Sequence, residues 1–538
     1  MHVCRRTANT SAAVYGVDGA SAPAAYVGGL IGVGTGAVNN STNSGDVRVT
    51  DVNSLATGAT TLTTTSMTVH SVGGLIGQLI PSATMTLDNN SSSGNVTVDT
   101  ARATVTSTST LNYYLISNVG GLIGTVGGSA NNANANWRVT LSNSSTSGNV
   151  SVASTTAASM SSYTSNVGLA TGGVIGRVDV AGGASLAFGG GLTLTNVTSS
   201  GNVSGYSAVG GLVGLSNLGS SLAGSNVFSN LSATGSVTGF GHTTSYAMIA
   251  TPTNYGQGVG GLFGANLGTV VGSIANSSYA GSVTSKGGGF IGGLAGASTG
   301  LISNSSATGT ITLPSTAMFA SPYGTAYIGG LVGVLGGGTT ATGIGGGSFS
   351  NVAINLGSSG ASPVQVTVFG VGGLVGYVSS PSNASTTGLT ASINDAYARG
   401  DIQGNLTGSN IGGLLGYSTT NDFVTGTAAV AGSTLTTTGV SSNYLGVGTL
   451  LKGEGILPGT YITSQSSGTS GGNGTYQLNQ AQTTGSAIAI KAFFSGYVNN
   501  SYATGNVIAP NTAAIRDNMS AKTMSSISAL DNSTKLRI

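Results

Sequence analysis

A short alternating pattern recurs along the chain: Asn or Asp, four mostly small residues, Gly, any residue, and then Val or Ile. In the last copy, Ala503 and Val507 fall on one side of the alternation, whereas Tyr502 and Thr504 fall on the other. Because successive side chains of a β-strand point to opposite faces, this period of two predicts a strand with one buried and one solvated face. The nine copies begin at Asn40, Asn89, Asn143, Asn196, Asn230, Asn276, Asn304, Asp395 and Asn500.

A second motif, Gly-Gly-Leu-hydrophobic-Gly with small variations, alternates with the first at intervals of 32 to 52 residues. Glycine permits positive φ and close backbone approach, so this motif is typical of a tight corner with one inward Leu. The Asn that opens the first motif also tolerates the left-handed region, which favours a turn there. The ten copies begin at Gly28, Gly73, Gly120, Gly172, Gly210, Gly260, Gly292, Gly329, Gly372 and Gly412.

Corners that alternate with short strands predict an all-β fold, an elongated parallel β-helix (β-solenoid) of about ten irregular repeats. A single coil cannot bury its own apolar face, so the coils are expected to stack at the strand spacing of about 4.8 Å. If a coil takes roughly 20–30 residues, the chain would form about twenty coils and a rod roughly 100 Å long.

The pattern also predicts which side chains point into the core. The inward residues of the first motif are expected to be Val47, Val96, Val150, Val203, Val237, Val283, Ile311, Ile402 and Val507. The inward leucines of the second motif are expected to be Leu30, Leu75, Leu122, Leu212, Leu262, Leu294, Leu331, Leu374 and Leu414. Charged residues within the first motif (Asp46, Arg399 and Asp401) fall on its polar face, which agrees with this register.

The spacing of the motifs divides the chain into five parts. We expect an N-terminal segment (1–26), the main solenoid (27–421), an inserted β-module (422–494), a final solenoid repeat (495–510) and a C-terminal tail (511–538). The repeat after Gly329 is degenerate, and its second motif is placed at 351–357. Within the module, short strands are expected at 434–438, 446–451, 459–463 and 474–478, between Gly-rich turns.

Composition narrows the function classes. Only 5% of the 538 residues are charged and the net charge is +2, so no basic field exists to hold a nucleic acid. The single cysteine, Cys4, excludes an internal disulfide framework. No apolar run is long enough for a transmembrane helix, and the first residues lack the apolar stretch of a signal peptide.

The paired motifs resemble the GLUG repeat, which is named for its Gly-Leu-x-Gly core. The resemblance covers roughly residues 27–508 apart from the module, and the stretches 259–264 and 276–283 form a representative pair. Such repeats occur in large secreted bacterial proteins, including adhesins similar to filamentous haemagglutinin, and beside the catalytic region of some immunoglobulin A peptidases. The resemblance implies an extracellular or cell-surface location and a β-helical stalk, and it carries no catalytic residue with it.

The sequence offers little material for catalysis. The three histidines (His2, His70 and His242) and the only glutamate (Glu454) are far apart in sequence, so no His-Glu-x-x-His zinc motif exists. Asp395 and Asp401 form the closest candidate carboxylate pair, but both occupy ordinary repeat positions, as does Asp46. We therefore predict no catalytic, cofactor-binding or metal-binding residue, no cofactor, and no enzymatic activity.

The leading functional hypothesis is an extracellular structural or adhesive segment that acts as a rigid stalk or display surface, with an unknown ligand. One alternative is a subunit of a self-assembling extracellular filament, because uncapped coil ends expose strand edges that pair end to end or edge to edge. Another is the non-catalytic repeat region of a larger secreted enzyme. The sequence alone leaves these alternatives open.

Overall fold

The computed structural model describes the repeat region and the inserted module. The described residues are 5–6, 10–14, 25–52, 67–81, 83–101, 114–127, 137–153, 170–179, 190–218, 226–240, 258–268, 272–287, 289–314, 325–336, 342–357, 367–379, 391–404, 410–418, 423–440, 445, 450–469, 471–484, 488–493 and 497–508. Every helix or strand assigned within these ranges is a β-strand.

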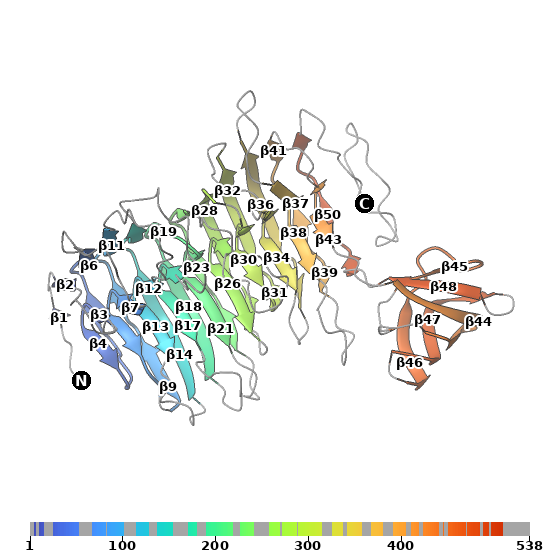
Figure 1. Ribbon diagram of the computed structural model, residues 1–538, viewed down its shortest axis with the longest axis horizontal. Helices are drawn as coiled ribbons and strands as arrows, with labels where there is room; N and C mark the ends of the chain where they lie inside the picture. The colour runs from blue at the N-terminus through green and yellow to red at the C-terminus, as the bar shows by residue number, and fades with distance from the viewer. Residues whose placement is uncertain are drawn as a thin grey trace, which may run out of the picture.

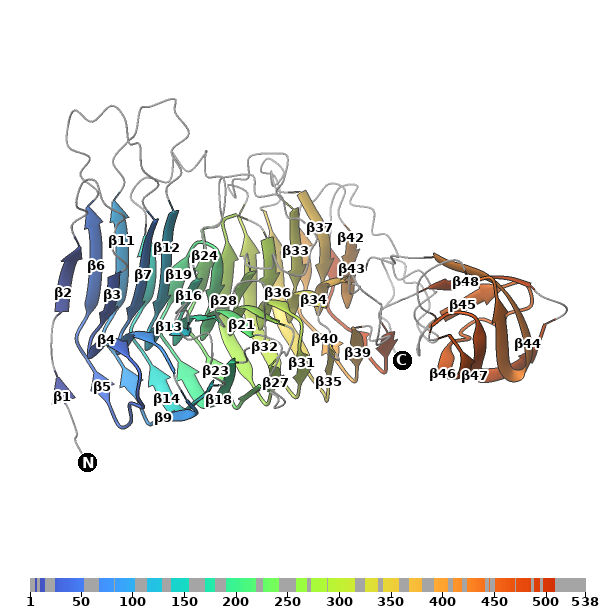
Figure 2. The same cartoon turned by 60° about the horizontal axis from the view of Figure 1, so that its bottom comes forward.

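Three parallel sheets run the length of the solenoid, and each coil contributes to all three (Figure 1, Figure 2). Sheet I contains β3 (Ala25–Gly28), β7 (Met67–Gly73), β12 (Tyr114–Gly120), β16 (Ala170–Gly172), β20 (Ala208–Gly210), β25 (Gly258–Gly260), β29 (Gly289–Gly292), β33 (Thr325–Gly329), β37 (Thr367–Gly372) and β42 (Asn410–Gly412). Sheet II contains β4 (Ile31–Gly34), β8 (Ile76–Leu79), β13 (Ile123–Gly127), β17 (Ile175–Asp179), β21 (Val213–Leu218), β26 (Phe263–Gly268), β30 (Ala295–Ser298), β34 (Val332–Gly336), β38 (Val375–Ser379) and β43 (Leu415–Ser418).

Sheet III is broader, because each coil crosses it in up to three short strands. Its strands are β1 (Arg5–Arg6), β2 (Thr10–Val14), β5 (Thr42–Asn43), β6 (Val47–Val52), β9 (Met85–Asp88), β10 (Ser91–Ser92), β11 (Val96–Ala101), β14 (Trp137–Thr146), β15 (Val150–Ala153), β18 (Gly190–Ser199), β19 (Val203–Gly205), β22 (Val227–Ser229), β23 (Ser232–Ala233), β24 (Val237–Gly239), β27 (Ser273–Ala275), β28 (Ser278–Ser285), β31 (Leu301–Ser303), β32 (Ser306–Leu313), β35 (Gly343–Gly345), β36 (Phe349–Leu356), β39 (Ser392–Asn394), β40 (Tyr397–Ala398), β41 (Ile402–Gly404), β49 (Tyr497–Asn499), β50 (Tyr502–Ala503) and β51 (Val507–Ile508).

The prediction of a parallel β-solenoid is confirmed, but the predicted coil size is wrong. Each strand of sheet I begins a new coil, numbered 1 to 10 here, so one pair of motifs forms one whole coil. Ten coils at about 4.8 Å give a stack roughly 45 Å long, about half the expected length. The reason is that a coil has three faces and variable connections, and so uses 32 to 52 residues between successive Gly-Gly motifs.

The Gly-Gly-Leu motif forms the corner between sheets I and II. In each of the ten coils two residues separate the strands of sheet I and sheet II. The backbones meet so closely that a Cβ on Gly120 would lie 1.9 Å from the Ile123 carbonyl oxygen, and one on Gly121 would lie 2.0 Å from the Gly173 carbonyl oxygen. The third glycine, Gly124, approaches the Val72 nitrogen in the same way, at 2.5 Å. Close backbone approach therefore requires all three glycines.

The predicted core residues point inward as expected. Eight of the nine named Val and Ile residues and eight of the nine named leucines are buried. Val507, in the last coil, and Leu30, in the first, are half-buried but pack against the same cluster. Fewer neighbouring coils cover the two end positions, which accounts for their greater exposure. The core is one continuous column of apolar side chains, mostly aliphatic, with a few aromatic rings such as Phe228 and Phe263.

The Asn that opens each first motif has the left-handed conformation that the sequence predicts. All nine positions have φ between 44° and 55°, Asp395 included. The predicted alignment of the degenerate repeat is wrong. Gly346 (φ 60°) takes the place of Asn in coil 8, since Gly345 pairs with Ser303 immediately before Asn304. Val352, not a glycine, then pairs with Gly309, so a stretch starting at Asn351 lies out of register.

Most of the variation in coil length lies at two corners, apart from one extra residue in sheet III of coil 8 and a bulge in β37. Between sheets III and I, the connection ranges from residues 206–207 to residues 240–257. Between sheets II and III, it ranges from residues 299–300 to residues 380–391. The inserted module occupies this second kind of corner in coil 10, between β43 and β49.

The module forms its own five-stranded antiparallel sheet, in the order β45-β48-β44-β47-β46. Its strands are β44 (Phe423–Thr438), β45 (Leu450–Gly453), β46 (Ile462–Gly468), β47 (Gly474–Thr483) and β48 (Ile488–Phe493). The four expected strands overlap four of these, but β44 and β47 are longer than predicted, and the sequence pattern missed β48. The module has a separate small core around Leu435, Ile462 and Tyr476.

Candidate functional site

Two polar ladders run along the outside of sheet III. The first, called here the turn ladder, consists of the nine left-handed residues that open the first motif. The side-chain amide of Asn89 donates to the side-chain oxygen (Oδ1) of Asn40 at 2.8 Å, and that of Asn304 donates to Oδ1 of Asn276 at 2.7 Å. Asn500 donates in the same way to the Asp395 carboxylate. The turn ladder thus joins neighbouring coils through exposed side chains.

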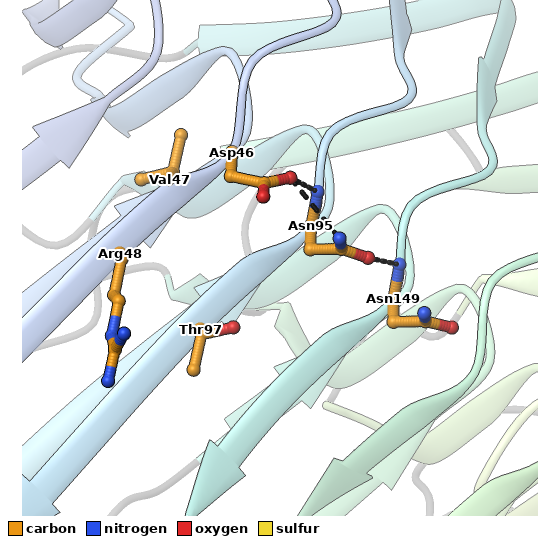
Figure 3. A pocket seen from close by; sticks show the side chains of 6 residues that line it. All are labelled: Asp46, Val47, Arg48, Asn95, Thr97 and Asn149. Carbon is orange, nitrogen blue, oxygen red and sulfur yellow. Dashed lines mark hydrogen bonds between the residues drawn. The ribbon is translucent and has the colours of Figure 1, made fainter. Parts of the chain in front are cut away.

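The second ladder, called here the corner ladder, follows the glycine of the first motif and is shown in Figure 3. The side-chain oxygen of each residue accepts the main-chain N–H of its counterpart in the next coil. The distances are 2.7 Å from Asn95 N to Asp46 Oδ1, 3.0 Å from Asn149 N to Asn95 Oδ1 and 2.9 Å from Asn202 N to Asn149 Oδ1. The ladder continues to Ser236. These bonds satisfy backbone donors at a corner where no strand partner is available.

Aspartate replaces asparagine at three places in these ladders. Asp46 accepts both the main-chain and side-chain N–H groups of Asn95, and Asp401 accepts the same pair from Asn506. In coil 8, the residues before Asp395 and Asp401 are Gly346 and Ala353, neither of which offers a side-chain acceptor. An ionised carboxylate only accepts hydrogen bonds, so it suits a first position that has nothing to donate to.

Asp88, beside the turn ladder, has a lowered pKa. Hydrogen bonds from the Ser142 hydroxyl at 2.6 Å and the Asn143 amide at 2.8 Å stabilise its charged form. The shift has a structural cause, since both donors belong to the next coil of the same sheet. It supplies no proton donor for neutral-pH chemistry.

A shallow depression lies along the start of the corner ladder (Figure 3). It has a volume of about 380 Å³ and is lined by Asp46, Val47, Arg48, Asn95, Thr97 and Asn149. Its groups can donate and accept hydrogen bonds, but they do not pair a base with a nucleophile. The depression is therefore a part of the polar surface of sheet III.

The candidate catalytic residues occupy separate parts of the chain. Asp395 belongs to the turn ladder and Asp401 to the corner ladder, and each accepts hydrogen bonds from its own partner in coil 10. Glu454 is exposed in the module. His2, Cys4, His242 and the side chain of His70 lie outside what the structure describes. Within the described part of the chain, no three His, Cys, Asp or Glu residues gather as metal ligands would.

Stacked aromatic rings near the end of the solenoid are the feature that the sequence analysis missed. On the outer face of sheet III, Tyr397 stacks on Phe349 at a centroid distance of 5.1 Å and on Tyr502 at 5.3 Å. The Arg399 guanidinium lies 4.5 Å from the centre of the Tyr397 ring. The sequence contained a signal for this stack, because Tyr397 follows Asp395 by two residues and Tyr502 follows Asn500 by two residues.

A second aromatic group lies between sheets I and II in coils 7 to 10. Tyr327 and Tyr377 stack at 4.6 Å, and Tyr377 and Tyr417 at 5.6 Å. Burial, with the nearby Tyr377 and Tyr417, raises the pKa of Tyr327 to about 12. In the N-terminal coils the same seam is polar: Ser71 and Thr125 share a buried hydrogen bond at 2.7 Å.

No family model, no curated protein and no solved structure matches this chain. Among the described residues there is no helix that could span a membrane.

Proposed function

We propose that this chain is an extracellular structural repeat segment, a rigid stalk that displays variable segments and the inserted module. The observation that carries the proposal is the difference in length among the corners of each coil. The Gly-Gly corner has the same length in all ten coils, whereas the connections of the two other corners vary widely. A fixed scaffold with variable projections is the arrangement expected of a display surface.

Stiffness follows from how neighbouring coils meet. The glycine ladder from Gly28 to Gly412 stays in register through every coil. Backbone contacts at the corner and a continuous apolar core leave no room for bending without breaking close packing. The turn and corner ladders add hydrogen bonds between coils on the outside.

The resemblance to GLUG repeats supports the proposed location at a bacterial surface. Few charges and a solvated face of Ser, Thr and Asn suit contact with an uncharged extracellular ligand, with the module and the variable corners as the contact elements. The adhesive role, the location and the family are proposed together, and binding measurements test the adhesive role.

The filament alternative is less well supported by the geometry. In the described part of the chain, β1 and β2 extend sheet III by half a coil beyond β3 and β4. If β50 and β51 of one copy paired with β1 and β2 of another, the ends of sheets I and II would face each other one strand spacing too far apart. Direct continuation of all three sheets is therefore mismatched.

Electron microscopy of the purified chain tests the stalk. We expect single particles with a solenoid roughly 45 Å long, at every protein concentration. Fibres that lengthen with concentration would overturn the stalk in favour of the filament. A deletion of 422–494 that joins the flanking residues with a short Gly-Ser linker should leave the solenoid folded, with a β-type circular dichroism spectrum and the same length in the microscope.

Adhesion is tested with the same two proteins. Each is applied to a printed glycan array and to a panel of purified matrix proteins. We expect the intact chain to bind a ligand that the deletion binds at least tenfold more weakly. Equal binding by both proteins would remove the module from the contact surface, and no binding by either would contradict the adhesive role.

A further inference from the structure

Four tyrosines pair across a single boundary of the solenoid, between coils 9 and 10. Tyr397 faces Tyr502 on sheet III, and Tyr377 faces Tyr417 on sheet II. In both pairs the two residues are direct neighbours in adjacent parallel strands. Coil 10 is the coil interrupted by the module, since its strand β43 precedes the insertion and β49 follows it.

The Tyr397–Tyr502 pair has the geometry that ring coupling needs. Its ring planes are inclined by only 9°, and the centroids are 5.3 Å apart. The unpaired electron of a tyrosyl radical has much of its density on the ring carbons next to the hydroxyl-bearing carbon, in orbitals perpendicular to the ring. Two nearly parallel, stacked rings in register therefore direct these orbitals toward each other.

We propose that Tyr397 and Tyr502 are a site of oxidative coupling, where a peroxidase-type one-electron oxidant joins the rings as dityrosine and locks coil 10 to coil 9. Each tyrosine loses one electron and one proton, and the two ring-carbon radicals form a carbon–carbon bond. The hydrogens on the joined carbons then move to the phenolic oxygens and restore both aromatic rings. In total, two hydrogen atoms leave the protein, and hydrogen peroxide accepts them to form water.

Ring geometry favours this pair over the Tyr377–Tyr417 pair, although all four rings are half-buried. Tyr397 and Tyr502 are half-buried on the outer face of the broad sheet, where an oxidant can approach their edges. The Tyr377–Tyr417 pair lies in the seam between sheets I and II, with ring planes inclined by 25° and centroids 5.6 Å apart. Because its rings are less parallel and farther apart, the Tyr377–Tyr417 pair is less well placed for coupling.

The chain itself shows that the stack tolerates phenylalanine. Phe349 stacks on Tyr397 at 5.1 Å with the planes inclined by 1°, in the same column of sheet III. Tyr502→Phe should therefore keep the stack and the fold while it removes one coupling partner. Tyr26→Phe, at an exposed ring in coil 1, is the matched control.

The test exposes the full chain to a heme peroxidase and hydrogen peroxide, and in parallel to a photo-oxidised ruthenium complex with persulfate. We expect dityrosine fluorescence and a crosslinked peptide that joins residues 397 and 502 and has lost two hydrogen atoms. The yield should not depend on protein concentration and should fall at least tenfold in Tyr502→Phe but not in Tyr26→Phe.

Three results would overturn the proposal: crosslinks mainly between molecules, a peptide joining Tyr377 to Tyr417 in equal or greater yield, or no coupling with either oxidant. Because peptide identification in the unsubstituted chain is the primary readout, the test survives if a variant fails to fold. A second readout is proteolysis, since coupled chains should keep residues 497–508 attached after the module has been cut.

Discussion

The main-chain N–H of Asn95 donates to the Asp46 carboxylate at 2.7 Å, across the boundary between coils 1 and 2. The same bond is repeated with asparagine as the acceptor in the following coils. An exposed side chain therefore completes the hydrogen bonding of the backbone in its neighbour.

Removing one acceptor from the corner ladder should destabilise the coil above it. Asn149→Ala leaves the Asn202 N–H without its partner at 2.9 Å. We expect the free energy of unfolding to fall by about 1 kcal/mol, the usual net value of such a bond. Asn149→Asp keeps the acceptor and should lose less. Equal losses for the two variants, measured by urea denaturation, would contradict the acceptor role.

The left-handed turn predicts a difference between glycine and alanine. Asn196 has φ 55° and bonds to both Asn143 and Asn230. Asn196→Gly loses only the ladder bonds, whereas Asn196→Ala must also hold a Cβ in this region, at an extra cost of about 1–2 kcal/mol. Thermal unfolding of both variants measures that difference. Equal melting temperatures would contradict the assigned conformation.

The glycine corner predicts a strong steric effect. A Cβ at Gly211 would lie 2.0 Å from the Gly261 carbonyl oxygen, so Gly211→Ala must displace the backbone of an adjacent coil. We expect local unfolding, seen as loss of amide-exchange protection in coils 5 and 6. Gly36→Ala is the control, since nothing lies within 4 Å of its added methyl group. Full protection in Gly211→Ala would refute the close approach.

The core predicts a large loss from a single truncation. Leu262 is fully buried, whereas Leu301 is 45% exposed on sheet III. Leu262→Ala should cost about 2–5 kcal/mol, and Leu301→Ala a small fraction of that. Denaturant unfolding of the two variants checks the inward register. Similar costs for both would show that the register is displaced by one residue.

The tyrosine seam predicts a loss of stability at high pH. Tyr327 ionises at about 12 in the folded chain, against 10.0 for an ordinary tyrosine. Between these values the unfolded chain gives up its proton first, so ionisation favours unfolding and stability falls as pH rises. Tyr327→Phe removes this contribution, and its melting temperature should fall less steeply above pH 10 than that of the unsubstituted chain. Parallel slopes would count against the burial of Tyr327.

Local chemistry made much of the fold predictable. Asn at a left-handed turn, glycine at a crowded corner and Val at alternate positions each follow from one residue and its neighbours. The number of residues per coil does not follow from such local rules. The connections lie outside the core, so core packing does not fix their lengths. The degenerate coil was misaligned because Gly346 replaces Asn there and Val352 replaces Gly.

The polar and aromatic surface features were harder to anticipate. Asp46, Asp395 and Asp401 were recognised as repeat positions, but the place of Asp395 and Asp401 at the start of a run of bonds depends on the side chains that coil 8 lacks. The Tyr397–Tyr502 stack joins residues 105 positions apart, as the Asp395–Asn500 contact does. The module lies between them in sequence, so their common offset from Asp395 and Asn500 was the only sequence signal that they are neighbours.

Because most of the length variation lies at two corners, the distance along the rod does not depend on the number of residues in a coil. The coil that begins at Gly260 reaches the next Gly-Gly after 32 residues, and the one that begins at Gly120 after 52, yet each advances by one strand spacing. Duplication or loss of a whole coil therefore changes reach in steps of about 4.8 Å, while insertions at the corners change the girth alone. The length of the rod and the size of its projecting connections can therefore evolve independently.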